Sequence, residues 1–236
     1  MKLMLAILQS VAWSLLVLSI AACAEQEESS KNTADKKITD YEQARAIFWQ
    51  QLYPNGGDTL YCGRPFLPRA RKNFNIEHVF PMSWVTNGLN CGKRKQCRST
   101  SAQFNIIEAD LHNLYPSRTD VNRARGSLKF GEVTGEARRY GRKCDFEVNS
   151  NSRIVEPRPE VRGDIARSMF YMANEYREQG LELFKNQANL LAQWNRLDPP
   201  SAQEKRRNDR IEKIQGNRNP FIDKPEGIDD LVRSWF

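Results

Sequence analysis

The chain has 236 residues, with 36 Lys and Arg against 29 Asp and Glu, a formal net charge of +7 and a pI of about 9.2. Its hydrophobic content of 39% and charged content of 28% fit a soluble globular body and exclude a chain too polar to bury a core. The length predicts about one domain after an N-terminal segment, and the basic charge favours nucleic acid or another anionic partner.

The N-terminal segment has the pattern of an export signal. Met1-Lys2 is a short positive start, Leu3–Ile20 is mostly apolar, and Ala21-Ala22-Cys23-Ala24 supplies small residues for cleavage. The apolar segment is barely long enough for a permanent membrane span, and it ends before an acidic stretch. We therefore predict a signal peptide over residues 1–22 and an exported protein, either in the periplasm, anchored to the outer membrane or secreted.

The cysteines help to distinguish two ways in which the signal peptide could be cleaved. Ile20-Ala21-Ala22-Cys23 resembles the lipobox of bacterial lipoproteins, which favours lipidation at Cys23, whereas Ala22-Cys23-Ala24 also fits an ordinary cleavage site. An exported protein rarely leaves a cysteine unpaired. With Cys23 lipidated or removed, four cysteines remain, enough for two disulfides in an oxidising compartment: Cys62, Cys91, Cys97 and Cys144.

The elements expected from the pattern follow in chain order. Residues 23–40 are polar and predict a flexible tether, Tyr41–Tyr53 predicts a helix, and Pro54–Asp58 a turn. The later expectations are a loop over Leu60–Pro68, a short strand from Phe74 ending at Pro81, a loop over Asn87–Thr100, a mixed segment over Asn105–Leu114, a helix over Thr119–Leu128, a strand or loop over Arg138–Val148, and helices over Gly163–Gln179, Leu181–Trp194 and Ala202–Gln215. Asp223–Phe236 forms a tail with an apolar end whose role the pattern does not indicate.

One pair of residues points to chemistry. From Thr59 to Ile107 the only acid is Glu77, and it precedes His78, one of two histidines in the chain. The same run is rich in basic residues, so the simpler explanation for Glu77 alone is an ordinary ion pair with one of them. For His78 alone, the simpler explanation is a structural histidine. Successive residues of a regular strand face opposite ways, so both can serve one site only if the strand ends, bulges or twists there.

Taken together, the two residues suggest a hard cation beside a proton acceptor. The few histidines and the oxidised cysteines make zinc improbable, whereas Mg²⁺ accepts one or two protein oxygens and phosphate oxygens. Glu77 can supply one oxygen, an Asn amide can supply another, and His78 can take a proton from water near neutral pH. Asn113 and Asn122 are both candidates for the amide ligand. For His112 a buried, hydrogen-bonded role is favoured.

Four blocks resemble the endonuclease I family of bacterial periplasmic and secreted nucleases. They are Asn75–Pro81 (NIEHVFP), Asp110–Pro116 (DLHNLYP), Asp120–Gly126 (DVNRARG) and Ile211–Phe221 (IEKIQGNRNPF). Their order and approximate spacing match the family across residues 41–222, the expected nuclease domain. The resemblance implies an α+β fold, a mixed α/β body that is mostly helical in its C-terminal part, with a ββα-metal (His-Me finger) active site.

The resemblance also implies roles for individual residues. Glu77 and Asn122 match the metal ligands, His78 the general base, and Arg94 an arginine that steadies the phosphate. Asn75 stands where the family often has Glu, and the loop between His78 and Arg94 is shorter than is usual in the family. The implied disulfides are Cys91–Cys97 and, as the other pair, Cys62–Cys144.

The resulting expectation is an exported, lipid-anchored, Mg²⁺-dependent endonuclease with weak sequence preference. It would act on DNA, with RNA as a second candidate, leave 5′-phosphates, and work as a monomer that meets a membrane only through its anchor. Mn²⁺ or Ca²⁺ are alternative cations. The basic residues expected to hold the nucleic-acid backbone are Arg71, Lys72, Lys93, Lys95 and Arg125. The rival hypothesis is a surface lipoprotein that binds DNA or another polyanion without cleaving it.

Overall fold

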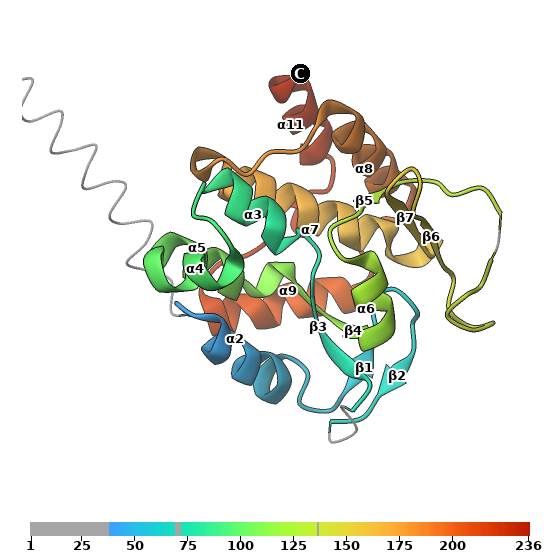
Figure 1. The fold of residues 1–236 in the computed structure, drawn as a ribbon, viewed down its shortest axis with the longest axis horizontal. Helices are drawn as coiled ribbons and strands as arrows, with labels where there is room; N and C mark the ends of the chain where they lie inside the picture. The colour runs from blue at the N-terminus through green and yellow to red at the C-terminus, as the bar shows by residue number, and fades with distance from the viewer. Residues whose placement is uncertain (1–37, 69–71, 136) are drawn as a thin grey trace, which may run out of the picture. The chain divides into compact units, whose positions relative to one another are not determined.

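The computed structural model describes residues 38–68, 72–135 and 137–236. The predicted signal peptide, Cys23, nearly all of the predicted tether and Arg71 lie outside this part of the chain. Residues Ile38–Phe236 form one compact unit (Figure 1). None of the helices in the described residues is long and apolar enough to cross a bilayer.

The first half of this unit alternates short helices with two-stranded pairings. Asp40 starts the first helix, because its side chain accepts a hydrogen bond from the backbone N–H of Gln43 at 2.9 Å. In order, the elements are α2 (Tyr41–Ile47), a π turn (Phe48–Leu52), β1 (Gly57–Asp58), β2 (Pro65–Phe66), β3 (Phe74–His78), α3 (Met82–Gly88), α4 (Arg94–Thr100), α5 (Ala102–Ala109), a 3-10 turn (Leu111–Asn113), β4 (Leu114–Arg118) and α6 (Thr119–Arg125).

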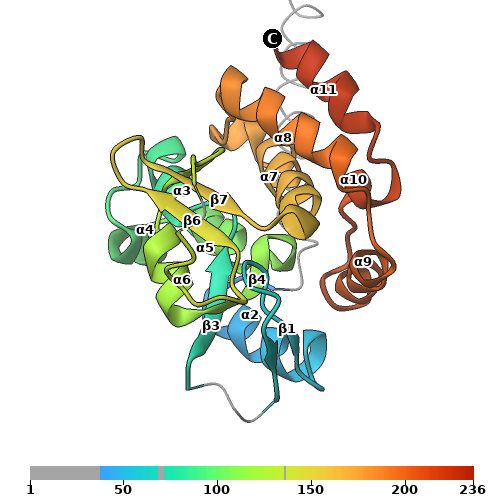
Figure 2. The same cartoon turned by 90° about the vertical axis from the view of Figure 1, so that its right-hand side faces the viewer.

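The second half contains a three-stranded sheet and then helices. In order, these are β5 (Lys129–Phe130), β6 (Phe146–Asn149), β7 (Ile154–Pro157), a 3-10 turn (Pro159–Val161), α7 (Arg162–Glu175), a second 3-10 turn (Arg177–Gln179), α8 (Lys185–Leu197), α9 (Ala202–Gln215), α10 (Pro220–Asp223) and α11 (Gly227–Trp235). Figure 2 shows α7 to α11 gathered on one side and the strands β3, β6 and β7 on the other. The architecture is α+β, as predicted.

The strands β3 and β4 and the helix α6 form a continuous ββα unit. The two strands are antiparallel, with His78 opposite Leu114 and Phe74 opposite Arg118. Arg118 ends β4 and directly precedes α6, so no loop separates the second strand from the helix. This connection brings the first turns of α6 back toward the end of β3, where Asn122 donates a hydrogen bond to the carbonyl oxygen of Ile76 at 3.1 Å.

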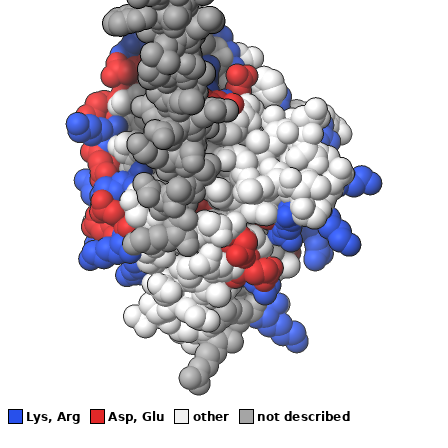
Figure 3. All heavy atoms as spheres, turned by 90° about the vertical axis from the view of Figure 1, so that its left-hand side faces the viewer, with Lys and Arg blue, Asp and Glu red and all other residues white. Residues whose placement is uncertain are grey.

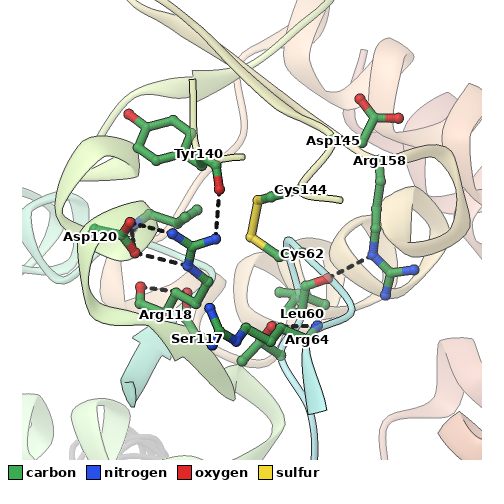
Figure 4. The surroundings of a disulfide bond; sticks show 12 residues. Leu60, Cys62, Arg64, Ser117, Arg118, Asp120, Tyr140, Cys144, Asp145 and Arg158 are labelled. Atoms are coloured by element: carbon green, nitrogen blue, oxygen red, sulfur yellow. Dashed lines mark hydrogen bonds and ion pairs between the residues drawn. A yellow bond between two sulfur atoms is a disulfide. The ribbon is translucent and has the colours of Figure 1, made fainter. Parts of the chain in front are cut away.

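Two disulfides confirm the expected pairing. Cys91–Cys97 joins the segment after α3 to α4, and Cys62–Cys144 joins residues 82 positions apart. Figure 4 shows how the second bridge lies beside the β4–α6 junction: the Arg118 side chain contacts Asp120 and donates to the carbonyl oxygen of Tyr140 at 2.7 Å. The loop that carries Cys62 is therefore fixed next to the ββα unit.

One expectation about local structure was wrong. Asn87–Thr100 is not a loop throughout, because α3 continues to Gly88 and α4 covers Arg94–Thr100. The segment Asp223–Phe236, for which the pattern indicated no role, mostly forms α11 and packs against the body. Trp235 lies 5.9 Å from the ring of Phe170, and the guanidinium of Arg177 lies 4.6 Å from the Trp235 ring.

Candidate active site

A cleft of about 1100 Å³ opens where β3 ends. The residues that line it include the predicted ligands, the predicted base and the predicted phosphate-binding arginine: Glu77, His78, Asn122 and Arg94. They come from β3, α4 and α6, which are far apart in the sequence. His78 is the last residue of β3, so the strand ends at the point where both Glu77 and His78 must serve one site. The geometric requirement stated from the sequence is therefore met.

The Glu77 carboxylate is buried and held at one oxygen. Tyr61 donates its hydroxyl hydrogen to Oε1 of Glu77 at 2.6 Å, and Nε of Arg125 lies 3.5 Å from the same oxygen. Burial raises the pKa of Glu77 to about 7, although Arg125 and Tyr61 act in the opposite direction. A backbone hydrogen bond from His78 acts in the same direction as Arg125 and Tyr61, and the carboxylate lines the cleft, where it can meet a cation.

The ring of His78 is oriented by the backbone. Its Nε2 lies 3.0 Å from the carbonyl oxygen of Glu108, and a carbonyl can only accept, so Nε2 carries the hydrogen and Nδ1 keeps a lone pair. Burial and then the nearby cation of Arg94 lower the pKa of His78 to about 3. The imidazole is therefore neutral at physiological pH and offers Nδ1 as a proton acceptor.

The two asparagine candidates occupy different environments. Asn122 lines the cleft and donates both amide hydrogens, to Oδ1 of Asn75 at 3.0 Å and to the carbonyl oxygen of Ile76. Because the amide nitrogen makes both of these hydrogen bonds, the amide oxygen Oδ1 of Asn122 remains available to a ligand. Asn113 is buried and uses its amide to hold Phe80, accepting from the Phe80 N–H at 2.6 Å and donating to the Phe80 carbonyl at 3.0 Å. Of the two candidates, Asn122 is therefore the one whose amide oxygen faces the cleft-lining residues.

The other histidine has the structural environment that was favoured for it. His112 is fully buried, its Nε2 lies 3.1 Å from the carbonyl oxygen of Asn217, and its ring packs 4.6 Å from the ring of Tyr171. The His112 carbonyl oxygen accepts a hydrogen bond from the Ser168 hydroxyl at 3.0 Å. The side chain therefore joins the ββα unit to α7 and to the segment after α9, away from the residues that line the cleft.

Arg94 is held from behind by a buried acid. Its Nε donates to Oε1 of Glu108 at 2.5 Å, and Arg98 binds the same carboxylate through Nε at 2.7 Å and Nη2 at 2.9 Å. The Arg94 side chain is 45% exposed, so its terminal nitrogens remain accessible. Glu108 thus supports two functional groups at once: its carboxylate positions Arg94, and its carbonyl orients His78.

Arg125 is buried, whereas the prediction placed it where substrate can reach it. Its side chain is completely buried, and its Nη2 donates to the carbonyl oxygen of Val79 at 2.6 Å. Its guanidinium packs 4.8 Å from the ring of Phe130 and faces Glu77. The physical reason is its position at the end of α6, on the face that packs against β3. Arg125 therefore contacts the predicted metal ligand Glu77 from inside the fold.

The other predicted phosphate contacts differ in how close they lie to the cleft. Lys93 lines it together with Arg94 and Arg98. Lys72 and Lys95 are exposed but do not line the cleft, so any contact they make would be with a longer stretch of backbone. On the face drawn in Figure 3, Lys and Arg side chains predominate along the right-hand edge, whereas the left-hand edge mixes both signs.

Sequence reasoning missed four residues that shape the site: Tyr41, Tyr61, Arg98 and Glu108. Tyr41 lines the cleft with its ring 5.2 Å from the ring of His78. For Glu108 a signal existed, because it is the acid that ends the long basic run around Glu77. For Tyr61 there was none, since its contact with Glu77 depends on how the Cys62 loop folds back on β3.

The residues of the cleft fit a hard divalent cation. No group of three or more His, Cys, Asp or Glu side chains arranged for a metal occurs in the described residues, so a zinc-like cage is not present there. The Glu77 carboxylate and the Asn122 amide instead line the same cleft, and Asn122 uses its amide nitrogen for its two side-chain hydrogen bonds. Mg²⁺ is commonly held by so few protein oxygens, since water and phosphate complete its shell. A cation there would also offset the burial that raises the pKa of Glu77.

Comparisons with known proteins identify the family of this chain. A sequence model of the family described as endonuclease I matches residues 19–226. A periplasmic deoxyribonuclease from Aeromonas hydrophila is 37% identical over 198 residues, which cover 74% of this chain and 81% of the relative. An extracellular deoxyribonuclease from the same organism is 41% identical over 171 residues, covering 69% and 71%. An extracellular ribonuclease from Bacillus amyloliquefaciens is 37% identical over 175 residues, covering 67% and 54%.

Proposed function

The chain belongs to the endonuclease I family, and from that premise we propose that it is an exported, Mg²⁺-dependent endonuclease that hydrolyses phosphodiester bonds of DNA with weak sequence preference. The observation that carries the proposal is the meeting of Glu77, His78 and Asn122 in one cleft with Lys93 and Arg94. RNA is a second candidate substrate, since relatives named as ribonucleases are similar over much of this chain. Attachment through a lipid on Cys23, 5′-phosphate products and a monomeric state belong to the same proposal.

Each side chain has a role that follows from its contacts. His78 takes a proton from water at Nδ1, because its Nε2 is occupied by the Glu108 carbonyl. A bound phosphate would offset the repulsion from Arg94 that helps to lower the pKa of His78, so the imidazole becomes a stronger base when substrate is present. The exposed nitrogens of Arg94 supply charge-assisted hydrogen bonds to a phosphate oxygen.

Glu77 would hold the cation through its carboxylate and Asn122 through its amide oxygen Oδ1. When bound, Mg²⁺ supplies charge neutralisation at the phosphate and at the departing 3′ oxygen. Tyr61 and Arg125 keep the Glu77 carboxylate in one orientation, and Asn75 together with Ile76 does the same for the Asn122 amide. Asn75 therefore has a definite supporting role, as an acceptor for Asn122, where many relatives are expected to carry Glu.

A plasmid assay tests the proposal. The mature protein should nick and linearise plasmid DNA in Mg²⁺, lose this activity in EDTA, and lose it in the His78→Ala variant. The Lys213→Ala variant, a change on an exposed face of α9, is the matched control and should cleave like the parent. Cleavage that persists in both EDTA and His78→Ala would overturn the mechanism. Binding of DNA in Mg²⁺ without cleavage would favour a non-catalytic polyanion-binding protein.

A further inference from the structure

A second cavity of about 650 Å³ continues from the catalytic cleft. Three residues line both spaces: Ser83, Asn87 and Ser127. The second cavity extends past α3 toward the β5–β7 sheet and the start of α8, where Lys129, Arg153 and Phe184 line it. A polymer that crosses the catalytic cleft can therefore pass directly into this space.

The far wall of the second cavity combines cations with an aromatic ring. Phe184 is 67% exposed, and Nζ of Lys129 lies 4.9 Å from the centroid of its ring. Arg153 is exposed at the turn between β6 and β7, where its φ of 56° is uncommon for a residue other than glycine. On the near wall, the Trp84 ring meets the Phe80 ring edge to face at 5.5 Å. Exposed aromatic rings interleaved with cations are typical of surfaces that bind single-stranded nucleic acid.

We propose that this cavity is a second substrate subsite, which takes an unpaired nucleotide of the strand that leaves the catalytic cleft. The base stacks on the ring of Phe184, while Lys129 and Arg153 contact the phosphates on either side of it. The charge of the two cations matches a phosphate backbone, and the aromatic ring matches a base that has left its stack. This inference rests on the proposed function and assigns a preference for single strands or unpaired ends over intact duplex.

The second cavity is also lined by one acid, whose removal should strengthen binding, whereas removal of the cations or the ring should weaken it. Glu182 lines the second cavity and is exposed. A carboxylate beside the proposed phosphate path weakens binding, so the Glu182→Gln variant should bind a strand that reaches the subsite more tightly than the parent does. If the cavity instead binds a cationic partner, Glu182→Gln should weaken the binding of that partner. If it binds an apolar partner, the substitution should leave the affinity unchanged.

The experiment measures affinity against strand length. Fluorescein-labelled single strands that lengthen one nucleotide at a time are titrated with the His78→Ala protein in Mg²⁺, and anisotropy gives the Kd. We expect a step in affinity at the length that reaches the second cavity. Adding Phe184→Ala or Lys129→Ala should remove that step, with binding of the longer strands weakened about 5- to 100-fold for the aromatic change. Arg153→Ala is the third variant, since its side chain lies at a turn and its loss does not affect the core.

Matched controls remove an exposed apolar and an exposed basic side chain elsewhere. Leu197→Ala, at a residue that is 73% exposed, and Lys213→Ala should keep the step. A step that survives all three subsite substitutions overturns the subsite, and so does equal loss for short and long strands. Tighter binding of duplex than of single strand overturns it as well. Failure of the proposed function shows separately, as a parent protein that does not cut plasmid DNA in Mg²⁺.

Discussion

At the scale of single residues, the cleft combines side chains that are proposed to touch substrate with buried side chains that contact and orient them. The composition around Glu77 and His78 was enough to predict a metal ligand and a base, because one acid in a basic run is unusual. It was not enough to separate an exposed arginine from a buried one. Arg94 and Arg125 look alike in the sequence, yet one is 45% exposed and the other is completely buried.

The buried Arg125 leads to a stability prediction. Arg125→Ala leaves Glu77 without its cationic partner and leaves the Val79 carbonyl without a donor, so the free energy of unfolding should fall by about 3 to 5 kcal/mol. Urea denaturation measures this. Arg123→Ala, on the exposed face of the same helix, should change it by less than about 0.5 kcal/mol. An Arg125→Ala protein with unchanged stability and weakened DNA binding would restore the original substrate-binding assignment.

Glu108 leads to a prediction about rate. Glu108→Gln keeps the carbonyl that orients His78 but removes the charge that positions Arg94, so the kcat for plasmid cleavage should fall by roughly 10- to 100-fold. Glu212→Gln, which removes an acid from an ion pair with Arg218 at the protein surface, is the control and should leave the rate unchanged.

A double-variant cycle identifies Glu108 as a positioning residue. If Glu108 acts through Arg94, then Arg94→Ala should cost less in the Glu108→Gln background than in the parent. Two fully additive losses would show that Glu108 affects cleavage by another route.

At the scale of elements, β3 and α9 could be predicted from the local pattern and α4 could not. The sequence of β3 begins with apolar and polar residues in alternation (Phe74 to Glu77) and meets Pro81 soon after its end, and α9 has a serine N-cap and a glycine end. Helix α4 buries only Cys97, so it has no apolar stripe, and its helical form depends on the disulfide to Cys91 and on the contact of its arginines with Glu108. Such tertiary causes leave no periodic pattern in the chain.

The contact between α7 and α9 is a second feature that depends on tertiary structure, and it makes the stability of the protein depend on pH. Arg167 lies between two carboxylates, with Nη2 at 2.6 Å from Glu204 and 3.2 Å from Asp164. Burial, and then the charge of Glu204, raise the pKa of Asp164 well above its usual range. A raised carboxyl pKa costs stability at pH values above the unfolded pKa of about 3.9, and the cost disappears at pH values below it.

Asp164→Asn should therefore be more stable than the parent at pH 7 and equally stable near pH 3. Thermal unfolding across this range measures the difference. Asp223→Asn is the opposite control: a hydrogen bond from Arg218 lowers the pKa of Asp223, so its replacement should lose stability at pH 7 and lose none in strong acid. A gain for Asp164→Asn that grows toward acid pH would contradict the direction of the Asp164 shift.

At the scale of the whole molecule, the two disulfides constrain very different lengths of chain. Cys62–Cys144 spans 82 positions and Cys91–Cys97 spans 6. Chain entropy predicts a loss of about 4 to 5 kcal/mol for the paired serine variant of the long bridge and about 2 kcal/mol for the short one. Urea denaturation of Cys62→Ser/Cys144→Ser and Cys91→Ser/Cys97→Ser compares them, and a larger loss for the short bridge would contradict this account. The short bridge should instead matter for cleavage, because α4 carries Arg94.

The start of the described chain has a consequence for where the protein can act. Ile38 is buried, and Tyr41, three residues later, lines the catalytic cleft. If the chain is attached to a membrane at Cys23, the fifteen steps to Ile38 reach at most about 50 Å when fully extended. The cleft would then sample a thin layer above the lipid, so that polymers lying along the cell surface are degraded well before those in the surrounding medium.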